Sequence, residues 1–384
     1  MAQWNRVPLI DYIELIGGGT PKTTVPEYWN GNIPWLSVKD FNNDKRYVYS
    51  TEKHISQSGF ENSPTKMLHK DDIIISARGT VGEIAMIPFD MAFNQSCYGI
   101  RASRGIDQPF LYYLLKNCIS QLKRMTHGSV FDTITRDTFA NIEVDIPDAE
   151  TQKRISSVLA DIDNKIEVND AINDNLQQQA AAFFSSLYDR SNTEVRFTDL
   201  IQILGGGTPK TGENTYWNGN IAFFTPKDVG TPYTLITEKT ISKEGLSHCN
   251  SRLYPVNTVF VTARGTVGKV GMSGVPMAMN QSCYALVGKE THQLLVYFYT
   301  LKAVDRLKHK ASGAVFDAIT TRDFESEQIM KLSDDDATAF LCVAEPMFQE
   351  ILNNNIENLR LSTLRDSLLP KLMSGEIDVS TVQL

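Results

Sequence analysis

The 384-residue chain has few of the residues that crosslink a protein or hold a metal. Its five cysteines are odd in number and never form a C-x-x-C pair, which argues against a disulfide framework and against a zinc site. Its six histidines show neither H-x-x-x-H nor H-E-x-x-H spacing, so a hydrolytic metal site would lack its usual ligands. We therefore expect no metal on this chain and a reducing compartment.

Long hydrophobic runs and nucleotide-binding motifs are also missing. No stretch approaches the roughly 18 apolar residues that a membrane span needs, and the first residues, MAQWNR, contain no apolar signal segment. The chain has no G-x-G-x-x-G, no Walker A and no N-P-P-Y loop of an amino-methyltransferase. These absences predict a soluble, cytoplasmic protein without a catalytic site.

One nuclease-like pattern does occur. Pro147-Asp148 followed by Asp163-x-Lys165 satisfies PD…(D/E)xK, whose carboxylates must converge on a metal from adjacent strands. The sequence pattern predicts that Asp163 and Lys165 lie in a long helix, so we interpret them as charges on a solvated helix face. A nuclease that uses Asp148, Asp163 and Lys165 remains the rival hypothesis from the class of enzymes.

What the chain does contain is one set of sequence blocks written twice. The spacing between copies is 188 residues for the first two blocks and 186 for the next two, and a period this long indicates two homologous domains rather than a solenoid. Two domains on one chain suit a target with two sites. The blocks are GGGTPKT at 17–23 and 205–211, YWNGNI at 28–33 and 216–221, ARGTVG at 77–82 and 263–268, NQSCY at 94–98 and 280–284, and GSVFDTIT at 128–135 against GAVFDAIT at 313–320.

The net charge of −8 is unevenly distributed. Residues 1–148 carry 15 Lys and Arg against 17 Asp and Glu, and residues 193–333 carry 15 against 12. The connecting residues 149–192 carry 4 against 7, and residues 334–384 carry 3 against 9. The acidity lies on the connectors, so the repeats remain free to present basic faces to a nucleic acid.

A long helix is predicted between the repeats. Residues 150–188 contain neither glycine nor proline, and their apolar positions step by four and three residues, as in a coiled-coil seam. Two seam positions are asparagines, which cost stability but fix register; alternatively, these asparagines face solvent on an ordinary helix. The seam comprises Ile155, Leu159, Ile162, Ile166, Asn169, Asn173, Leu176, Ala180, Phe183 and Leu187.

A second long helix is predicted after the second repeat. Pro346 reads as a first-turn residue, and an apolar stripe from Met347 through Leu364 and Leu368 extends to Pro370. We expect the two helices to pack antiparallel as a rod of roughly 57 Å that separates two domains. Strand-like runs at 72–77 and 258–263 and short helices at 110–125 and 294–308 predict mixed α+β domains.

Several repeated residues read as structural. We expect Cys97 and Cys283, which match in position, to be small buried residues, and Trp29 and Trp217 to belong to the core. The GGG run permits positive φ before Pro21, which would make it a turn; alternatively, it cradles phosphate with the help of Lys22 or Lys210.

The order of these blocks resembles the specificity subunit of type I restriction-modification systems. Residues 364–377, LRDSLLPKLMSGEI, are similar to the C-terminal conserved region of that family, and the resemblance covers the whole chain. It implies an α+β fold with two target recognition domains, separated by two long antiparallel helices and related by a pseudo-two-fold axis. The implied domains are residues 1–148 and 191–335, with a central helix at 149–190 and a C-terminal helix and tail at 336–384.

The resemblance also implies a function. Each repeat would read one half of a bipartite double-stranded DNA target, while the helices set the spacer and dock two methyltransferase subunits that methylate adenine at N6. Restriction subunits would join the full complex, and S-adenosylmethionine, ATP and Mg²⁺ would bind partner subunits, with no cofactor on this chain and no membrane partner. The alternative from another class is a two-headed protein-binding scaffold without DNA specificity.

Shared and divergent residues predict different DNA contacts. Because two domains that read different half-sites need similar phosphate contacts but different base contacts, the shared blocks suit the backbone and the divergent stretches suit the bases. For Arg78 and Arg264 a structural pairing within the loop is the alternative. The predicted DNA-binding residues are Lys22, Lys39, Arg46, Arg78, Lys123, Arg124, His127, Lys210, Lys227, Arg264, Lys308, His309 and Lys310. The predicted docking residues on the helices are Asn169, Asn173, Leu176, Asn355, Asn358 and Leu359.

Overall fold

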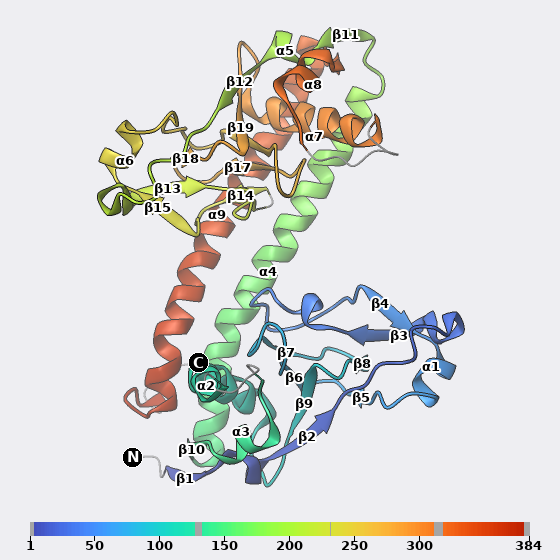
Figure 1. Ribbon diagram of the computed structural model, residues 1–384, viewed down its shortest axis with the longest axis vertical. Helices are drawn as coiled ribbons and strands as arrows, with labels where there is room; N and C mark the ends of the chain where they lie inside the picture. Colours follow the sequence, from blue (N-terminus) through green and yellow to red (C-terminus); the bar gives the residue numbers. More distant parts are fainter. Residues whose placement is uncertain (1–3, 127–132, 231, 311–317, 380–384) are drawn as a thin grey trace. The chain divides into compact units, whose positions relative to one another are not determined.

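A computed structural model describes residues 4–126, 133–230, 232–310 and 318–379 (Figure 1). The chain divides into two compact units. Unit 1 comprises Met1–Glu167 and Leu359–Leu384, and unit 2 comprises Val168–Asn358. Each unit therefore combines one copy of the repeat with a segment of each long helix.

Unit 1 is built from small sheets with helices beside them. Its described strands pair in the orders β1-β10, β2-β9-β6-β7 and β4-β3-β8-β5, and β3 runs parallel to β8. The strands are β1 Asn5–Pro8, β2 Ile13–Gly17, β3 Trp29–Leu36, β4 Lys53–Ile55, β5 Met67–Leu68, β6 Ile73–Ser76, β7 Ile84–Met86, β8 Met91–Phe93, β9 Cys97–Ala102 and β10 Glu143–Ile146. The helices are η1 Leu9–Tyr12, η2 Pro26–Tyr28, η3 Val38–Asp40, α1 Gln57–Glu61, α2 Gln108–Thr126 and α3 Arg136–Ala140.

Unit 2 repeats this plan. Its described strands pair in the orders β11-β20, β12-β19-β16-β17-β14 and β15-β13-β18, and β13 runs parallel to β18 as β3 does to β8. The strands are β11 Thr193–Arg196, β12 Ile201–Gly205, β13 Trp217–Phe224, β14 Tyr233–Thr234, β15 Lys239–Ile241, β16 Val259–Thr262, β17 Val270–Ser273, β18 Met277–Met279, β19 Cys283–Gly288 and β20 Gln328–Lys331. The helices are α5 Phe197–Leu200, η4 Asn214–Tyr216, α6 Lys243–Ser247, α7 Gln293–Lys310 and α8 Thr321–Ser326.

The strands and helices expected from the repeats are present. The runs IIIS of β6 and VFVT of β16 are buried at every position, as continuous apolar stretches are when both faces of a strand are covered. The helices α2 and α7 pack their buried aromatic and aliphatic side chains into the main core of their own unit. The expected mixed α/β fold class, with two homologous domains and two long helices, is confirmed.

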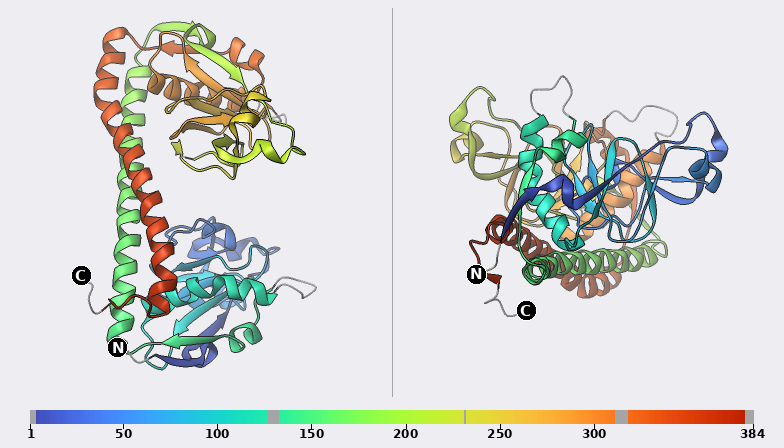
Figure 2. Two further views of the ribbon diagram at one scale, coloured as in Figure 1. Left: turned by 90° about the vertical axis from the view of Figure 1, so that its left-hand side faces the viewer. Right: turned by 90° about the horizontal axis from the view of Figure 1, so that it is seen from below.

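The two long helices are α4 Ala149–Tyr188 and α9 Asp334–Met373. In unit 1, Ile155 and Leu159 share a core with Leu369 and Leu372. In unit 2, the later part of α4 shares a core with the earlier part of α9. Within each unit the helix segments therefore run side by side and antiparallel (Figure 2).

The asparagines of the predicted seam lie between the helices. Asn169 is fully buried and donates from Nδ2 to Glu357 Oε2 at 2.7 Å and to Asn358 Oδ1 at 2.9 Å. Asn173 donates to Asn355 Oδ1 at 3.0 Å and accepts from Asn354 Nδ2 at 2.9 Å. The prediction of a polar layer in the seam is confirmed, and the alternative of solvent-facing asparagines is wrong.

The predicted start of the second helix is wrong. Pro346 does not lie in the first turn of α9, which begins twelve residues earlier at Asp334. Ser333 starts the helix by accepting the Asp336 amide at its hydroxyl, 3.1 Å away, and three consecutive aspartates then occupy the positive end of the helix dipole. Pro370 also lies inside the helix, which continues to Met373.

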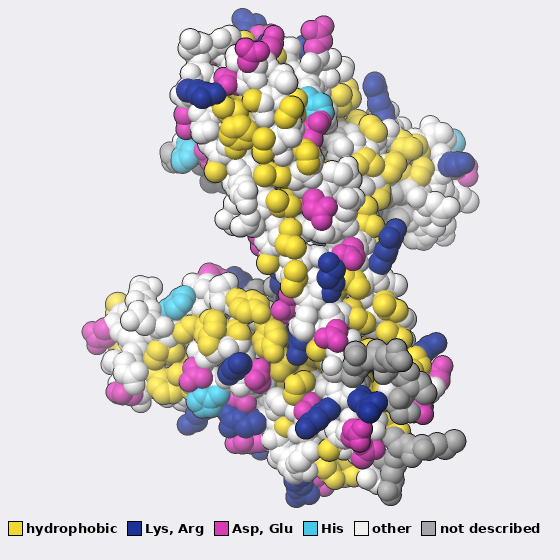
Figure 3. Space-filling model, turned by 180° about the vertical axis from the view of Figure 1, so that it is seen from behind, with side chains coloured by type: hydrophobic (Ala, Val, Ile, Leu, Met, Phe, Trp, Pro, Cys, Tyr) yellow, Lys and Arg dark blue, Asp and Glu magenta, His cyan; other side chains and the backbone are white. Residues whose placement is uncertain are grey.

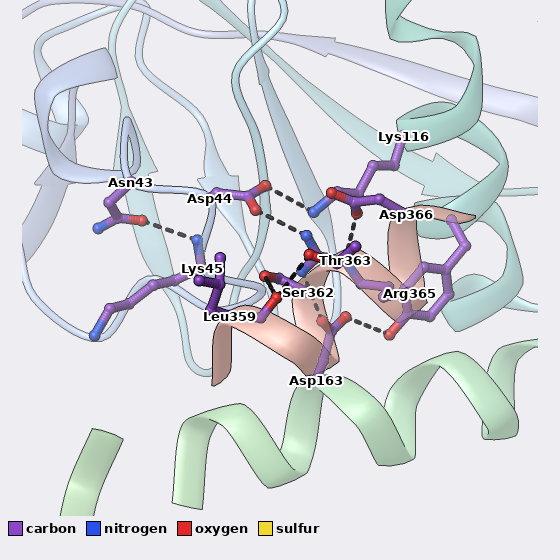
Figure 4. Close-up of polar contacts among 11 residues, drawn as sticks. Asn43, Asp44, Lys45, Lys116, Asp163, Leu359, Ser362, Thr363, Arg365 and Asp366 are labelled. Atoms are coloured by element: carbon purple, nitrogen blue, oxygen red, sulfur yellow. Dashed lines mark hydrogen bonds and ion pairs between the residues drawn. The ribbon is translucent and has the colours of Figure 1, made fainter. Parts of the chain in front are cut away.

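Two further expectations for the helices are wrong. Leu364 is 47% exposed rather than part of the buried stripe, and Arg365 is buried beside it. Asp163 does not lie on a solvated face: it accepts from Arg365 Nη1 at 2.9 Å and from the Tyr113 hydroxyl at 2.6 Å (Figure 4). Both charges can be buried because each one satisfies the other.

Asp44 and Lys116 extend this contact to the surface of unit 1. Arg365 donates to Asp44 at 2.8 Å, and Lys116 of α2 lies 2.8 Å from the other Asp44 oxygen. Burial alone would lower the pKa of Arg365, but hydrogen bonds to Asp366 and Asp163 and the charges of Asp163 and Asp44 raise it. We call Asp44, Lys116, Tyr113, Asp163 and Arg365 the charged clamp; it joins α2 and a loop to α4 and α9.

None of the described helices is apolar enough over a sufficient length to cross a membrane. The long helices α4 and α9 instead carry charged and amide side chains throughout. Burial raises the pKa of the Cys97 and Cys283 thiols to about 12, and both residues are confirmed as small buried residues.

Candidate functional site

The repeated blocks that are far apart in sequence meet at one place in each unit. In unit 1, the Gly19 amide donates to the Phe93 carbonyl at 3.0 Å, and the Thr20 hydroxyl bonds to Gln95. In unit 2, the Gly207 amide donates to the Met279 carbonyl at 3.1 Å. The equivalent hydroxyl bond joins Thr208 to Gln281. The GGGT and NQS blocks therefore form one structural element in both copies.

The glycine run serves close packing rather than a turn. A Cβ atom at Gly18 would lie 2.1 Å from the Asn94 carbonyl oxygen, and one at Gly206 would lie 2.2 Å from that of Asn280. None of the glycines in the two GGG runs has a positive φ, so the expectation based on positive φ is wrong. The second and third glycines of each run are needed because the backbones touch there, whereas a Cβ at Gly17 or Gly205 would meet no atom within 4 Å.

Positive φ angles occur instead in the third block. We call residues 78–82 and 264–268 the RGTVG loops, and the φ angles of their glycines are +80° and +84° in unit 1 and +85° and +75° in unit 2. Such angles are unfavourable for any residue with a Cβ atom. The amide of Gly82 closes one loop onto the Ser76 carbonyl at 3.0 Å, and that of Gly268 closes the other onto Thr262 at 2.9 Å.

Two other repeated blocks, the one with Ser96 or Ser282 and the one with Ile134 or Ile319, hold the RGTVG loops. The Ala77 and Arg78 amides both donate to the Ser96 carbonyl, at 2.8 and 3.2 Å, and the Ala77 carbonyl accepts from Ile134 at 3.0 Å. The same bonds recur in unit 2 from the Ala263 and Arg264 amides to Ser282 and from Ile319 to Ala263. Two of the other four blocks thus hold the exposed loop directly in each unit.

Basic side chains surround each loop. Arg78 and Arg264 are exposed, and neither side chain makes an ion pair with any described residue. The alternative of a structural pairing within the loop therefore receives no support from the described residues. The Lys123 stem lies over Gly82 and the Lys308 stem over Gly268, each with Cε 2.6 Å from where a Cβ would be. The loop and the lysine of α2 or α7 form one basic surface in each unit.

Lys22, Lys39, Lys210 and Lys227 are also exposed. The carbonyl of Lys22 accepts from the Trp29 ring nitrogen at 3.3 Å, and that of Lys210 accepts from Trp217 at 3.1 Å. Both tryptophans are half-buried and pack edgewise on a neighbouring ring, which agrees with their interpretation as packing residues. Lys227 lies 3.5 Å from Glu238 in an exposed ion pair.

Arg46 lies elsewhere than expected. It is 8% exposed, donates to Asn164 of α4 at 3.2 Å and lies 5.1 Å from the centre of the Tyr47 ring. The guanidinium is buried against α4, which favours a role in packing over a contact with DNA. We therefore remove Arg46 from the set of candidate DNA contacts and regard it as a residue that joins the first domain to α4.

The remaining predicted residues at the ends of α2 and α7 are partly accounted for. His309 lies 3.7 Å from Asp305. Lys310 lies 2.5 Å from Glu327, a buried carboxylate that Arg306 also contacts at 3.0 Å. Lys310 therefore stabilises a buried charge. The side chain of Arg124 and the whole of His127 lie outside the described residues.

The nuclease-like residues do not converge. Asp148 caps the start of α4 by accepting the Thr151 amide at 2.9 Å, whereas Asp163 lies fifteen residues further along the helix, roughly 22 Å away. Asp163 is also occupied by Arg365. Among the described residues, no group of three or more His, Cys, Asp or Glu side chains could hold a metal ion.

The predicted docking residues are mostly turned inward. Asn169, Asn173, Asn355 and Asn358 bond to one another's helix, and Leu176 and Leu359 are half-buried. Other residues of the helices expose apolar side chains to solvent. These are Val168 and Ile172 of α4 and Val343 and Leu364 of α9, and hydrophobic side chains are visible on the helical surface in Figure 3.

Comparison with known proteins connects these features to one family. A family model described as "Type I restriction modification DNA specificity domain" matches residues 1–178 and again residues 190–331. The two matches correspond to the two copies of the repeat. They cover most of the chain.

Individual relatives agree with the family match. The MjaIX type I restriction enzyme specificity subunit of Methanocaldococcus jannaschii is 24% identical, over 98% of this chain and 94% of the relative. The HindI specificity subunit of Haemophilus influenzae is 25% identical, over 70% of this chain and 77% of the relative. A solved type I restriction-modification S subunit from M. genitalium has the same fold, with a TM-score of 0.59 at 13% identity over 97% of this chain and 96% of that one.

Proposed function

The chain belongs to the family of type I restriction modification DNA specificity domains and is a specificity subunit with two such domains, and from that premise we propose that each domain reads one half of a bipartite double-stranded DNA target. One observation carries this proposal. In both units the repeated blocks converge on an exposed RGTVG loop whose arginine makes no ion pair with described residues. Shared, exposed cations suit the phosphates that both half-sites have in common.

We assign the backbone contacts to cations of the shared blocks and to the lysines of α2 and α7 that lie beside them. Arg78 and Lys123 in unit 1 and Arg264 and Lys308 in unit 2 occupy equivalent positions on the two RGTVG surfaces. The exposed Lys22 and Lys210 belong to the GGGTPKT block, and the exposed Lys39 and Lys227 follow the YWNGNI block at equivalent positions; these four lysines complete the proposed set. Base reading is left to stretches where the repeats differ, such as residues 42–50 against 230–235.

The long helices are the proposed docking surface for two methyltransferase subunits, with restriction subunits in the full complex. Val168, Ile172 and Leu364 support this proposal, because large apolar side chains exposed on a helix favour contact with a partner. The helices would also set the spacer between half-sites. Adenine N6 methylation and ATP-driven restriction, with S-adenosylmethionine, ATP and Mg²⁺, would belong to cytoplasmic partner subunits, and this chain would catalyse no reaction.

The first test is to map N6-methyladenine in the host genome with the gene intact and deleted. We expect a split sequence motif that is methylated only when the gene is present. An unchanged methylation pattern in cells that express an active methyltransferase partner would contradict the proposal and favour the protein-binding scaffold.

A second test exchanges residues 1–148 for the corresponding domain of another specificity subunit. We expect one half of the methylated motif to change and the other half to remain, because the main core of unit 2 contains no residue of the exchanged domain. A change in both halves would contradict independent reading. This exchange also tests the proposed domain boundaries 1–148, 149–190, 191–335 and 336–384.

A further inference from the structure

The two RGTVG loops differ in charge at the residue that follows them. Glu83 stands in unit 1 where Lys269 stands in unit 2. Their backbones are held alike: the Glu83 amide donates to the Ser76 hydroxyl at 2.8 Å, and the Lys269 amide donates to the Thr262 hydroxyl at 2.9 Å. The same framework therefore carries opposite charges in the two units.

The neighbouring cations are the same in both copies. Residue 83 directly follows Gly82, which packs under the Lys123 stem, and residue 269 follows Gly268, whose Cβ position lies 3.3 Å from the Lys308 ammonium. Counting the loop arginine, unit 1 combines two cations with one carboxylate, whereas unit 2 combines three cations. The two surfaces differ by two charges.

Neither charge has a structural explanation among the described residues. The carboxylate of Glu83 is half-buried and the ammonium of Lys269 is exposed, and neither makes a hydrogen bond or ion pair with a described residue. In unit 2, Lys269 follows the loop that carries Arg264 and over which the Lys308 stem lies, and a bound anion relieves repulsion among like charges. Duplex DNA offers closely spaced phosphates, which a compact group of lysine and arginine side chains neutralises with release of counterions.

The second repeat as a whole is also more positively charged than the first. Residues 193–333 carry 15 Lys and Arg against 12 Asp and Glu, whereas residues 1–148 carry 15 against 17. We infer that the RGTVG surface of unit 2 is the stronger of two unequal phosphate clamps, with Lys269 as the residue that distinguishes it. This inference rests on the proposed DNA-reading function and adds that the two half-sites are held with unequal electrostatic force.

The test measures the salt dependence of DNA binding by the full chain in complex with its methyltransferase subunits. The probe is a fluorescent 40-base-pair duplex of random sequence, because phosphate contacts do not need the target motif. The variants are Lys269→Gln and Glu83→Lys. Lys331→Gln is the matched control, since it removes one exposed positive charge of unit 2 that lies beside Asp334 on α9.

We expect Lys269→Gln to reduce the slope of log K against log salt by up to about 1, and Glu83→Lys to increase it by a similar amount. Lys331→Gln should leave the slope unchanged. A slope in Lys269→Gln equal to that of the wild type, with the wild-type complex still binding DNA, would overturn the inference and leave the proposed function intact. No binding by a folded wild-type complex, together with no methylated motif, would overturn both.

Discussion

In both units a domain packs against the long helices at matched positions. The side chains at these positions are charged in unit 1 and apolar in unit 2. Asp148 and Ser333, 185 residues apart, start α4 and α9 by the same backbone bond to the residue four positions on. The same offset aligns Asp163 with Phe348 and Arg365 with Ala180, and all four are buried. Unit 1 therefore places an ion pair where unit 2 places apolar side chains.

The residues that the domains contribute to these contacts differ in the same way, polar in unit 1 and apolar in unit 2. At this offset Tyr113 of α2, which bonds to Asp163, aligns with Phe298 of α7, whose ring centre lies 5.6 Å from that of Phe348. Phe184 adds contacts to Phe298 at 4.9 Å and Phe340 at 5.4 Å. The same backbone arrangement therefore accepts either a buried ion pair or a cluster of aromatic side chains. The stability of a charged clamp requires every charged partner to be present, because an unpaired buried charge is costly. The stability of an aromatic cluster depends on how completely its side chains fill the buried volume.

We expect the largest loss of stability when a side chain is removed from the aromatic cluster of unit 2. Phe184→Ala would leave a cavity among four rings in unit 2 and should destabilise that unit by roughly 3 to 5 kcal/mol. Hydrogen exchange measured by peptide would localise the loss to unit 2. Phe89→Ala, at a phenylalanine that is 45% exposed, is the control and should change stability by less than about 1 kcal/mol. Equal losses in the two variants would show that the cluster is not the source of stability.

On the charged side, Arg365→Ala would leave the Asp163 carboxylate buried without its cation. We expect unit 1 to lose about 3 to 4 kcal/mol, because an uncompensated buried charge costs more than the pair contributes. Urea unfolding measures the loss, and the exposed Arg360→Ala on the same helix is the matched control. A loss within about 0.5 kcal/mol of that control would contradict the assignment of Arg365 as the centre of the clamp.

The apolar residues of unit 2 can be introduced at the matched positions of unit 1. The variant Tyr113→Phe, Asp163→Phe, Arg365→Ala gives unit 1 the residues of unit 2 and should recover most of the loss in Arg365→Ala, to within about 2 kcal/mol of the wild type. The reason is that neither charge of the buried Asp163–Arg365 pair remains. The same urea experiment decides the matter, since a triple variant as unstable as the single one would show that the two junctions are not interchangeable.

The smallest expected effect is the loss of stability of unit 1 at low pH, when Asp44 is protonated. Burial would raise the pKa of Asp44, but Lys116 and Arg365 together hold it below its usual value. A lowered folded pKa adds stability above the unfolded pKa of about 3.9, and this contribution is lost as pH falls through the folded value. Because the Asp44 side chain is 66% exposed, the loss should stay under about 1 kcal/mol. Asp44→Asn should remove it, and unfolding at pH 6 and pH 3 measures the difference; an unchanged pH dependence would contradict the role of Asp44.

Much of the fold could be predicted because its signals are local or repeated. The heptad spacing of α4, the asparagines at its seam and the apolar runs of β6 and β16 indicate structure within short windows. The start of α9 could have been found as well, since a serine before three aspartates is a strong signal for the start of a helix.

The charged clamp could not be predicted from local patterns. Arg365 follows an apolar residue in a helical stripe, and its partners Asp163 and Asp44 are 202 and 321 residues away in sequence. Asp44 also lies in a stretch that is two residues longer in the first repeat, so comparison of the copies does not reveal it. For the candidate site, the shared blocks indicated the RGTVG loops, whereas Arg46 looked like any exposed cation. The opposite charges of Glu83 and Lys269 could have been found by reading one residue past the shared block.

The core of unit 1 is assembled from segments that leave the ribosome at very different times. Leu369, Leu372 and Met373 pack with Ile155 and Leu159, yet all of unit 2 is synthesised between these two groups. At about 5 to 20 residues per second, roughly 190 residues take roughly 10 to 40 s. During that delay the first domain has an uncovered apolar face and an unpaired Asp163. We therefore expect unit 1 to start folding first and to finish last, with unit 2 complete before it.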